Sequence, residues 1–166
     1  MFYLRVLALL VALIQFVPHI ALAFPQKGEP APPFKVTSTS GQQITVVNYR
    51  GNVLLLEFFA TWCSPCRDST AHLIKLNQKY GRQGLHVLGV SLDDDNEKAV
   101  REFIIANRIN FPVAFAGEDM EADYAIRSVP TLYVVGKKGL IAERFTGYSE
   151  EVEKRLDQLL RKLLSE

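Results

Sequence analysis

The chain has 166 residues, which is enough for one domain around a single hydrophobic core and too few for two ordinary domains. Lys and Arg number 19 against 18 Asp and Glu, so the formal net charge is only +1. No run of basic residues interleaved with aromatic ones occurs, and this argues against a surface that binds nucleic acid.

The first 23 residues have the layout of a secretory signal peptide. A single positive charge, Arg5, precedes an apolar run from 6 to 17, and the small residues Ala21 and Ala23 form a cleavage site. The apolar run is about a dozen residues long, short of the roughly 20 that a membrane-spanning helix needs. We therefore expect cleavage after Ala23 and a soluble protein in the periplasm or cell envelope, with an uncleaved membrane anchor as the alternative.

Residues 24–33 contain four prolines and predict an extended linker that leads into a domain of residues 34–166. Strands are expected at 34–37 and 44–47, as an N-terminal hairpin, and then at 53–59, 85–91, 112–116, 131–135 and 140–145. Helices are expected after Cys66, around Val100 and Phe103, at 118–126, and from Ser149 onward. Strands that alternate with helices before a closing hairpin and helix predict an α/β sandwich with a mixed sheet.

Two helix boundaries follow from local chemistry. The helix after Cys66 takes its apolar set from Ala71, Leu73, Ile74 and Leu76, and Gly81 and Gly84 end it. The next helix follows the run Asp93-Asp94-Asp95, which predicts a solvated turn that caps the helix. A metal or partner site is the less common use of such an acidic run.

Only two cysteines occur, Cys63 and Cys66, and their spacing favours chemistry over structural cross-linking. A bond between them closes a very small loop and removes little chain entropy from the unfolded state. The pair sits where a buried strand turns into a helix, and the unpaired N–H groups and dipole of a helix N-terminus stabilise a thiolate. We therefore predict an exposed Cys63 with a lowered pKa as the nucleophile, and Cys66 as the thiol that resolves the mixed disulfide. Pro65 keeps the turn rigid.

A metal site is the alternative use of the two cysteines. Structural zinc needs four ligands, and the sequence has neither a second cysteine pair nor a His-x-x-x-His run. His72 and His86 are isolated, and His19 belongs to the predicted signal peptide. A copper carrier would want a third ligand close to the pair, and no histidine has an obvious claim. We expect no metal and no cofactor.

Three motifs carry a resemblance to a known family. Residues 58–67 read Phe-Phe-Ala-Thr-Trp-Cys-Ser-Pro-Cys-Arg, a Val129-Pro130-Thr131 run opens a later strand, and Gly147 lies beyond the last hairpin. Over residues 30–164 the chain resembles the thioredoxin superfamily and, within it, the exported TlpA/ResA-like branch. The resemblance implies a three-layer sandwich with a mixed central sheet, and the segment around 93–116 looks like the helix-strand insertion of this branch.

The resemblance also implies roles for residues around the cysteines. Pro130 should be in cis and lie against the Cys63-Cys66 turn, where the backbone of Val129 can pair with an extended substrate. A proline that simply starts a strand is the alternative. Trp62 and Pro65 are expected beside the substrate, with ordinary core filling as the alternative for Trp62.

Glu57 interrupts the most apolar predicted strand, 53–59. Burial there should raise its pKa towards neutrality, where a carboxyl can exchange a proton with a thiol. In thioredoxins a buried acid occupies the matching position, so Glu57 is the candidate base for Cys66. A carboxylate at a sheet edge or reaching water is the alternative.

The chain departs from the branch at two points. Ser69 and Ala71 stand where many relatives carry a glutamate and a proline. The dipeptide between the cysteines lacks a histidine, and the absence of this histidine favours a reductant or mild exchanger over a strong oxidant. We expect a monomeric thiol-disulfide oxidoreductase that acts on disulfides of exported proteins, with a membrane electron donor. The family resemblance implies apocytochromes c among its substrates. A thiol peroxidase is one alternative, although its Pro-x-x-x-Thr-x-x-Cys run is absent before Cys63. A copper-binding or chaperone module is the other.

Overall fold

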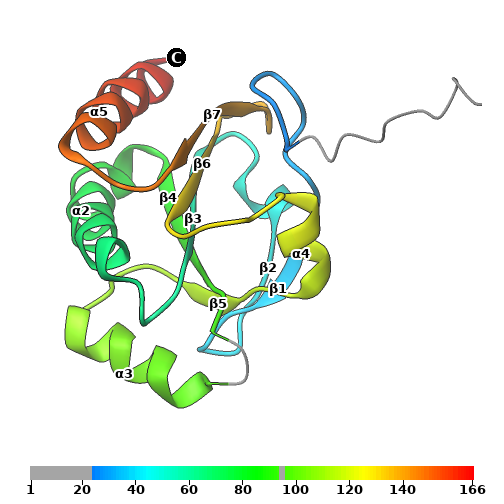
Figure 1. Ribbon diagram of the computed structural model, residues 1–166. Coiled ribbons are helices and arrows are strands. Elements are labelled where there is room, and N and C mark those ends of the chain that lie inside the picture. Colours follow the sequence, from blue (N-terminus) through cyan, green and yellow to red (C-terminus); the bar gives the residue numbers. More distant parts are fainter. Residues whose placement is uncertain (1–23, 94–95) are drawn as a thin grey trace, which may run out of the picture.

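Five strands form the central sheet: β3 (Val53–Phe59), β4 (Leu85–Ser91), β5 (Val113–Phe115), β6 (Thr131–Val135) and β7 (Ile141–Thr146). Their spatial order is β5-β4-β3-β6-β7 (Figure 1). The strands β3, β4 and β5 run parallel to one another, whereas β6 is antiparallel to both β3 and β7. The sheet is therefore mixed and ends in a hairpin, as the sequence predicts.

The computed structural model describes residues 24–93 and 96–166. The predicted signal peptide, residues 1–23, lies outside these ranges, as do Asp94 and Asp95 of the predicted acidic turn. Within the two described ranges, no helix combines the length and apolar character needed to cross a membrane.

Two further layers cover the sheet (Figure 1). The helices on one face are α2 (Ser64–Tyr80), α3 (Glu97–Asn107) and α5 (Glu150–Ser165). The other face carries α4 (Glu118–Asp123) and a two-stranded antiparallel sheet of β1 (Lys35–Thr37) and β2 (Gln43–Thr45). Two short 3-10 helices, η1 (Val46–Tyr49) and η2 (Gly81–Gln83), connect strands and helices. The predicted three-layer α/β sandwich is confirmed, and α3 with β5 is the predicted helix-strand insertion.

All seven residues of β3 are buried, because this strand lies in the middle of the sheet and is covered on both faces. Side chains alternate between the two faces of a strand. Val53, Leu55 and Phe59 accordingly join the core beneath α2, α3 and α5, while Leu54 and its alternate neighbours join the core beneath α4. Glu57 falls on the α2 side, in a position that is otherwise apolar.

Helix α2 leads away from the end of β3, and its inward face is more polar than the sequence pattern predicts. Leu73 and Leu76 are buried as expected, but Ala71 is exposed. Ser69, Thr70 and His72 are buried on the inward side. The prediction for Ala71 is wrong because the polar side chains of this helix find hydrogen-bond partners inside the molecule, which makes their burial acceptable.

Two predicted elements end at least two residues earlier than expected. The strand predicted at 44–47 ends at Thr45, because the side chain of Asn48 accepts hydrogen bonds from the backbone N–H and the hydroxyl of Thr45 and turns the chain into η1. The helix predicted at 118–126 ends at Asp123. There Tyr124 leaves the helix to bury its ring against Phe58 and Tyr133.

The proline-rich segment 24–33 lies along the entry to β7. Gly28 N–H donates to the Ile141 carbonyl at 2.8 Å, and Ile141 N–H donates to the Glu29 carbonyl at 2.8 Å. Ala31 N–H donates to the Gly139 carbonyl at 3.0 Å, and the Ala31 side chain is buried in the core. These contacts hold the segment against the domain.

Candidate active site

Cys63 and Cys66 form a disulfide bond at the point where β3 gives way to α2. Their sulfur atoms are 2.05 Å apart and their Cα atoms 5.3 Å apart. Cys63 is the N-cap residue of α2, and its Sγ accepts a hydrogen bond from the backbone N–H of Cys66 at 3.2 Å. Pro65 lies in the first helical turn, as predicted. A sulfur atom therefore occupies the N-terminal position at which a helix favours negative charge.

The two sulfur-bearing residues differ in exposure. Cys66 is fully buried, and Cys63 is only 5 % exposed, so the expectation of an exposed Cys63 is wrong for this oxidised form. The turn folds the side chain of Cys63 over the helix end, where it joins the core cluster beneath α2. Cys63 is nevertheless the outer residue of the pair, which is the order the sequence predicts.

Trp62 and Pro65 flank the disulfide at the surface. The side chain of Trp62 is 75 % exposed, which excludes ordinary core filling. Pro65 is also exposed. Both side chains are apolar and exposed, and both lie within two residues of Cys63 in the sequence.

The peptide bond between Val129 and Pro130 is cis, as the family resemblance implies. Pro130 is buried, and its carbonyl accepts a hydrogen bond from Gly147 N–H at 2.8 Å. Val129 is half-buried and packs against the core cluster that contains both cysteines. Within residues 24–93 and 96–166, neither the N–H nor the carbonyl of Val129 forms a hydrogen bond to the backbone. This backbone is therefore available to an extended partner.

Glu57 is 1 % exposed, which confirms that it is desolvated. Ser69 Oγ donates a hydrogen bond to Glu57 Oε1, and Thr70 Oγ1 lies 3.4 Å from Oε2. Burial raises the pKa of Glu57 to about 7, and the two hydroxyls lower it by a smaller amount because they stabilise the carboxylate. The sheet-edge alternative is wrong, since β3 is the middle strand.

Ser69 relates Glu57 to the disulfide. It lies three residues after Cys66 on α2, so the two residues share one face of the helix. Both are fully buried, and the Glu57 carboxyl contacts the helix at Ser69. The carboxyl thus lies beneath the helix face that carries the inner cysteine.

The acidic run predicts a solvated turn at Asp93, but this residue is buried, so the prediction is wrong for Asp93. It is 8 % exposed and accepts hydrogen bonds from Thr61 and Ser91. The cap of α3 is instead Asn96, whose side chain accepts from Ala99 N–H at 3.1 Å. An acidic run gives no signal that one of its members turns inward, because the partner Thr61 is 32 residues away.

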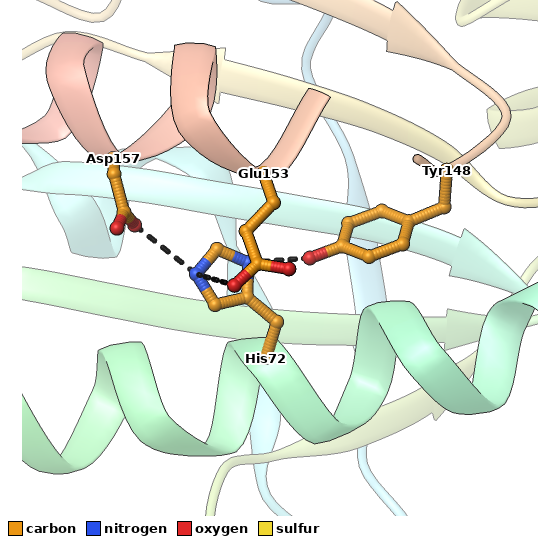
Figure 2. Close-up of polar contacts among 4 residues, drawn as sticks. All are labelled: His72, Tyr148, Glu153 and Asp157. Carbon is orange, nitrogen blue, oxygen red and sulfur yellow. Dashed lines mark hydrogen bonds and ion pairs between the residues drawn. The ribbon is translucent and has the colours of Figure 1, made fainter. Parts of the chain in front are cut away.

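His72, which the sequence shows only as a histidine without a neighbouring metal ligand, belongs to a polar network. Figure 2 shows its ring between Tyr148, which precedes α5, and the α5 carboxylates Glu153 and Asp157. Its Nε2 is 3.1 Å from Asp157 Oδ1 and 4.0 Å from Glu153 Oε1. A carboxylate only accepts, so Nε2 carries a hydrogen towards Asp157, and Nδ1 forms the hydrogen bond with the Tyr148 hydroxyl. Burial, with the nearby Glu153 carboxylate, raises the pKa of Tyr148 and keeps its hydroxyl a donor.

Across residues 24–93 and 96–166, no three or more His, Cys, Asp and Glu side chains are placed so as to hold a metal ion. The site instead consists of a disulfide, a buried carboxyl and a free stretch of backbone at Val129.

A disulfide at a helix N-terminus and a cis-proline loop that packs on the same core cluster, on a three-layer α/β sandwich, define a thioredoxin-like thiol-disulfide oxidoreductase. The sequence profile of the AhpC/TSA family matches residues 27–144, and the chain belongs to this family.

Relatives of known name agree with this class. The chain is 34 % identical over 136 residues to the thioredoxin-like protein YneN of Bacillus subtilis (strain 168), which covers 80 % of this chain and 79 % of YneN. It is 30 % identical over 139 residues to a thiol-disulfide oxidoreductase ResA of Bacillus cereus, covering 83 % and 79 %. Both alignments span most of each protein.

Solved structures agree as well. A putative thiol:disulfide interchange protein DsbE from Chlorobium tepidum superimposes with a TM-score of 0.79 at 27 % identity, over 84 % of this chain and 99 % of that one. A putative protein disulfide isomerase from Bacteroides thetaiotaomicron gives a TM-score of 0.78 at 26 % identity, over 86 % and 92 %. The thioredoxin-like fold is confirmed, and the protein is a thiol-disulfide oxidoreductase.

Proposed function

We propose that the protein reduces or exchanges disulfides in extracytoplasmic proteins, with Cys63 and Cys66 as its reactive dithiol. The observation that carries the proposal is the hydrogen bond from Cys66 N–H to Cys63 Sγ at the start of α2. This contact and the helix dipole favour a thiolate on the outer cysteine, and the thiolate is the attacking species in disulfide exchange. The oxidised pair described above is the end point of one reductive turnover.

In the first step, the Cys63 thiolate attacks one sulfur of a substrate disulfide. A bond forms between Cys63 Sγ and that sulfur, and the substrate disulfide breaks. The second substrate sulfur leaves as a thiolate and takes a proton from water. The product is a mixed disulfide between Cys63 and the substrate.

In the second step, Cys66 attacks Cys63 Sγ and releases the remaining substrate thiolate. Cys66 must lose its proton first, and Glu57 is the acceptor that we assign to it. The carboxyl lies beneath the same helix face, and its pKa of about 7 suits proton exchange with a thiol. Overall, two electrons pass from the dithiol to the substrate.

The substrate binds alongside the cis-proline loop. The free N–H and carbonyl of Val129 support pairing with an extended substrate segment, in the manner of an added strand. Trp62 and Pro65, which neighbour the cysteines in the sequence, supply an exposed apolar surface. Pro130 is buried and acts by placing Val129.

The setting we propose is extracytoplasmic. The N-terminal sequence has the pattern of a cleaved signal peptide. Structural relatives include the putative thiol:disulfide interchange protein DsbE from Chlorobium tepidum. A membrane electron donor would reduce the Cys63-Cys66 disulfide again, and the cysteines of apocytochromes c are a substrate class that fits a reductant. We propose that the protein acts as a monomer. We also propose that it works as a reductant, because the dipeptide Ser64-Pro65 between the cysteines lacks a histidine.

Cysteine variants test the chemistry. Cys63→Ser should abolish reduction of insulin disulfides, whereas Cys66→Ser should accumulate a mixed disulfide with the substrate that a reductant releases. Undiminished insulin reduction by Cys63→Ser would contradict the assigned nucleophile. Hydrogen peroxide consumption at a comparable rate would point instead to a thiol peroxidase.

Two measurements test direction and place. Equilibration with glutathione gives the reduction potential, and a potential well below that of the glutathione pool supports a reductant. N-terminal sequencing of the protein from cell fractions should begin at Phe24 in the extracytoplasmic fraction. Recovery from the cytoplasm with Met1 intact would contradict export.

A further inference from the structure

Asp93 is the centre of a hydrogen-bond cluster beside the disulfide loop, outside the residues with assigned roles. Its Oδ2 accepts from Thr61 N–H at 2.9 Å and from Ser91 Oγ at 2.6 Å. Its Oδ1 accepts from Thr61 Oγ1 at 2.6 Å. We propose that Asp93 is a positioning residue for disulfide exchange, which holds the Thr61-Trp62-Cys63 segment in place through Thr61. The inference rests on the proposed role of Cys63 as nucleophile.

The anchor of this cluster is the sheet itself. Ser91 is the last residue of β4, and its hydroxyl both donates to the Asp93 carboxylate and accepts from Asp93 N–H at 3.1 Å. Leu92 N–H donates to the Phe59 carbonyl at 2.9 Å, which joins the ends of β4 and β3. Asp93 is therefore fixed relative to the strand from which the disulfide loop departs.

Several hydrogen bonds hold the loop between that strand and the sulfur atoms. After Phe59, the Ala60 carbonyl accepts from Cys63 N–H at 3.1 Å. Thr61 is bound to Asp93 through both its N–H and its hydroxyl. Cys63 Sγ accepts from Cys66 N–H. The bonds to Thr61 come from Asp93, in the segment that follows β4, and not from the loop itself.

A buried carboxylate is expensive unless hydrogen bonds compensate for the lost water. Asp93 is 8 % exposed, and two hydroxyls and one N–H within 2.9 Å supply that compensation. The same bonds fix both the orientation of the Thr61 peptide and its side chain. Reaction rates depend steeply on such placement, since a shift of about 1 Å can cost on the order of 100-fold.

Substitutions at both ends of the contact separate positioning from charge. Asp93→Asn keeps the shape but removes one acceptor and the charge, whereas Thr61→Val removes only the hydroxyl donor. Thr61→Ser keeps that donor and serves as the conservative rescue. Asp119→Asn, an exposed aspartate in α4, is the matched control for loss of a negative charge.

Two readouts report on the loop. The first is the second-order rate of the reduced protein with a small disulfide, and the second is the fluorescence anisotropy of Trp62, the only tryptophan of the chain. We expect Asp93→Asn and Thr61→Val each to lower the rate roughly 10- to 100-fold and to lower the anisotropy. Thr61→Ser and Asp119→Asn should match the parent, and the double variant should be little slower than either single one.

Parental rates and anisotropy in Asp93→Asn and Thr61→Val would overturn the proposal, even with a lowered melting temperature. An effect of Asp93→Asn without an effect of Thr61→Val would also overturn it, since charge and not position would then be responsible. If Asp93→Asn does not fold, the comparison of Thr61→Val with Thr61→Ser decides. Retention of activity by Cys63→Ser would instead overturn the proposed function, whatever the Asp93 variants do.

Discussion

Glu57 on β3 accepts a hydrogen bond from the hydroxyl of Ser69 on α2, so a buried carboxyl joins the central strand to the helix that begins at the disulfide. Burial favours the neutral acid, and the hydroxyls of Ser69 and Thr70 favour the carboxylate. Burial is the larger effect and raises the pKa of Glu57 to about 7. This carboxyl therefore changes its protonation state in the neutral range.

The first prediction concerns stability against pH in the oxidised protein. An unfolded Glu57 loses its proton near pH 4.5, whereas the folded one retains it until about pH 7. The unfolded state then binds fewer protons between these values, so the free energy of unfolding falls as pH rises from 4.5 to 7. From the pKa difference, the total loss is about 3 kcal/mol.

Glu57→Gln should abolish this part of the pH dependence. Urea unfolding of both proteins at pH 4 and pH 8 measures it, because other titrating groups cancel in the comparison. Parallel stability curves would show that Glu57 keeps an ordinary pKa. The same variant should lose the neutral-pH inflection in the disulfide exchange rate if Glu57 serves Cys66.

The second prediction concerns the Ser69 hydroxyl. Ser69→Ala removes a donor that stabilises the Glu57 carboxylate, so the pKa of Glu57 should rise further. The variant should lose about 1 kcal/mol more stability at pH 8 than at pH 4, since a hydrogen bond to a charged acceptor is the stronger one. Thr70→Ser, which keeps a hydroxyl, is the control. Equal losses at the two pH values would contradict the prediction.

The third prediction concerns the contact between α2 and the loop before α5. Tyr148→Phe removes the hydroxyl that is bound to His72 Nδ1 and should lower the free energy of unfolding by about 1 kcal/mol. Tyr80→Phe is the control, because the described part of the chain provides no hydrogen-bond partner for the Tyr80 hydroxyl. Urea unfolding at pH 7 compares the two. An equal effect of both variants would argue that the Tyr148-His72 bond contributes nothing.

The fourth prediction tests packing in the centre of the sheet. A methyl group at Gly89 of β4 would lie 3.3 Å from atoms of Phe59 and Phe111, and 3.4 Å from Val113. Because rings in a filled core cannot easily move aside, Gly89→Ala should destabilise the protein by about 1–3 kcal/mol.

Gly81 provides the control for Gly89. Its φ of −56° suits any residue, and an added methyl group would meet only Asn77 Oδ1 at 3.6 Å. Gly81→Ala should be neutral or stabilising by up to about 1 kcal/mol, since it restricts the unfolded chain. Thermal unfolding compares the two variants, and similar melting temperatures would refute the packing argument.

Much of the fold is readable from consecutive residues. The apolar run 53–59 predicts a covered strand, and β3 has these bounds with every residue buried. Ser149 is the N-cap of α5, where its hydroxyl accepts from Val152 N–H. Such features depend on periodicity and on contacts within one turn, so the sequence carries them directly.

The candidate site is readable in part. The Cys63-Cys66 spacing predicts a disulfide at a helix start, which the structure contains. An acid within an apolar strand predicts a raised pKa for Glu57, and burial does raise it. These inferences succeed because strand burial and helix position each follow from neighbouring residues.

The sequence by itself determined the order of strands and helices, the place of the cysteine pair and the burial of Glu57. Only the tertiary structure decided which polar residues turn inward. Asp93 meets Thr61 across 32 residues, and His72 meets Tyr148 across 76. A buried polar side chain needs a partner, and the choice of partner depends on which strand ends and helix faces the topology brings together. No periodicity along the chain records that choice.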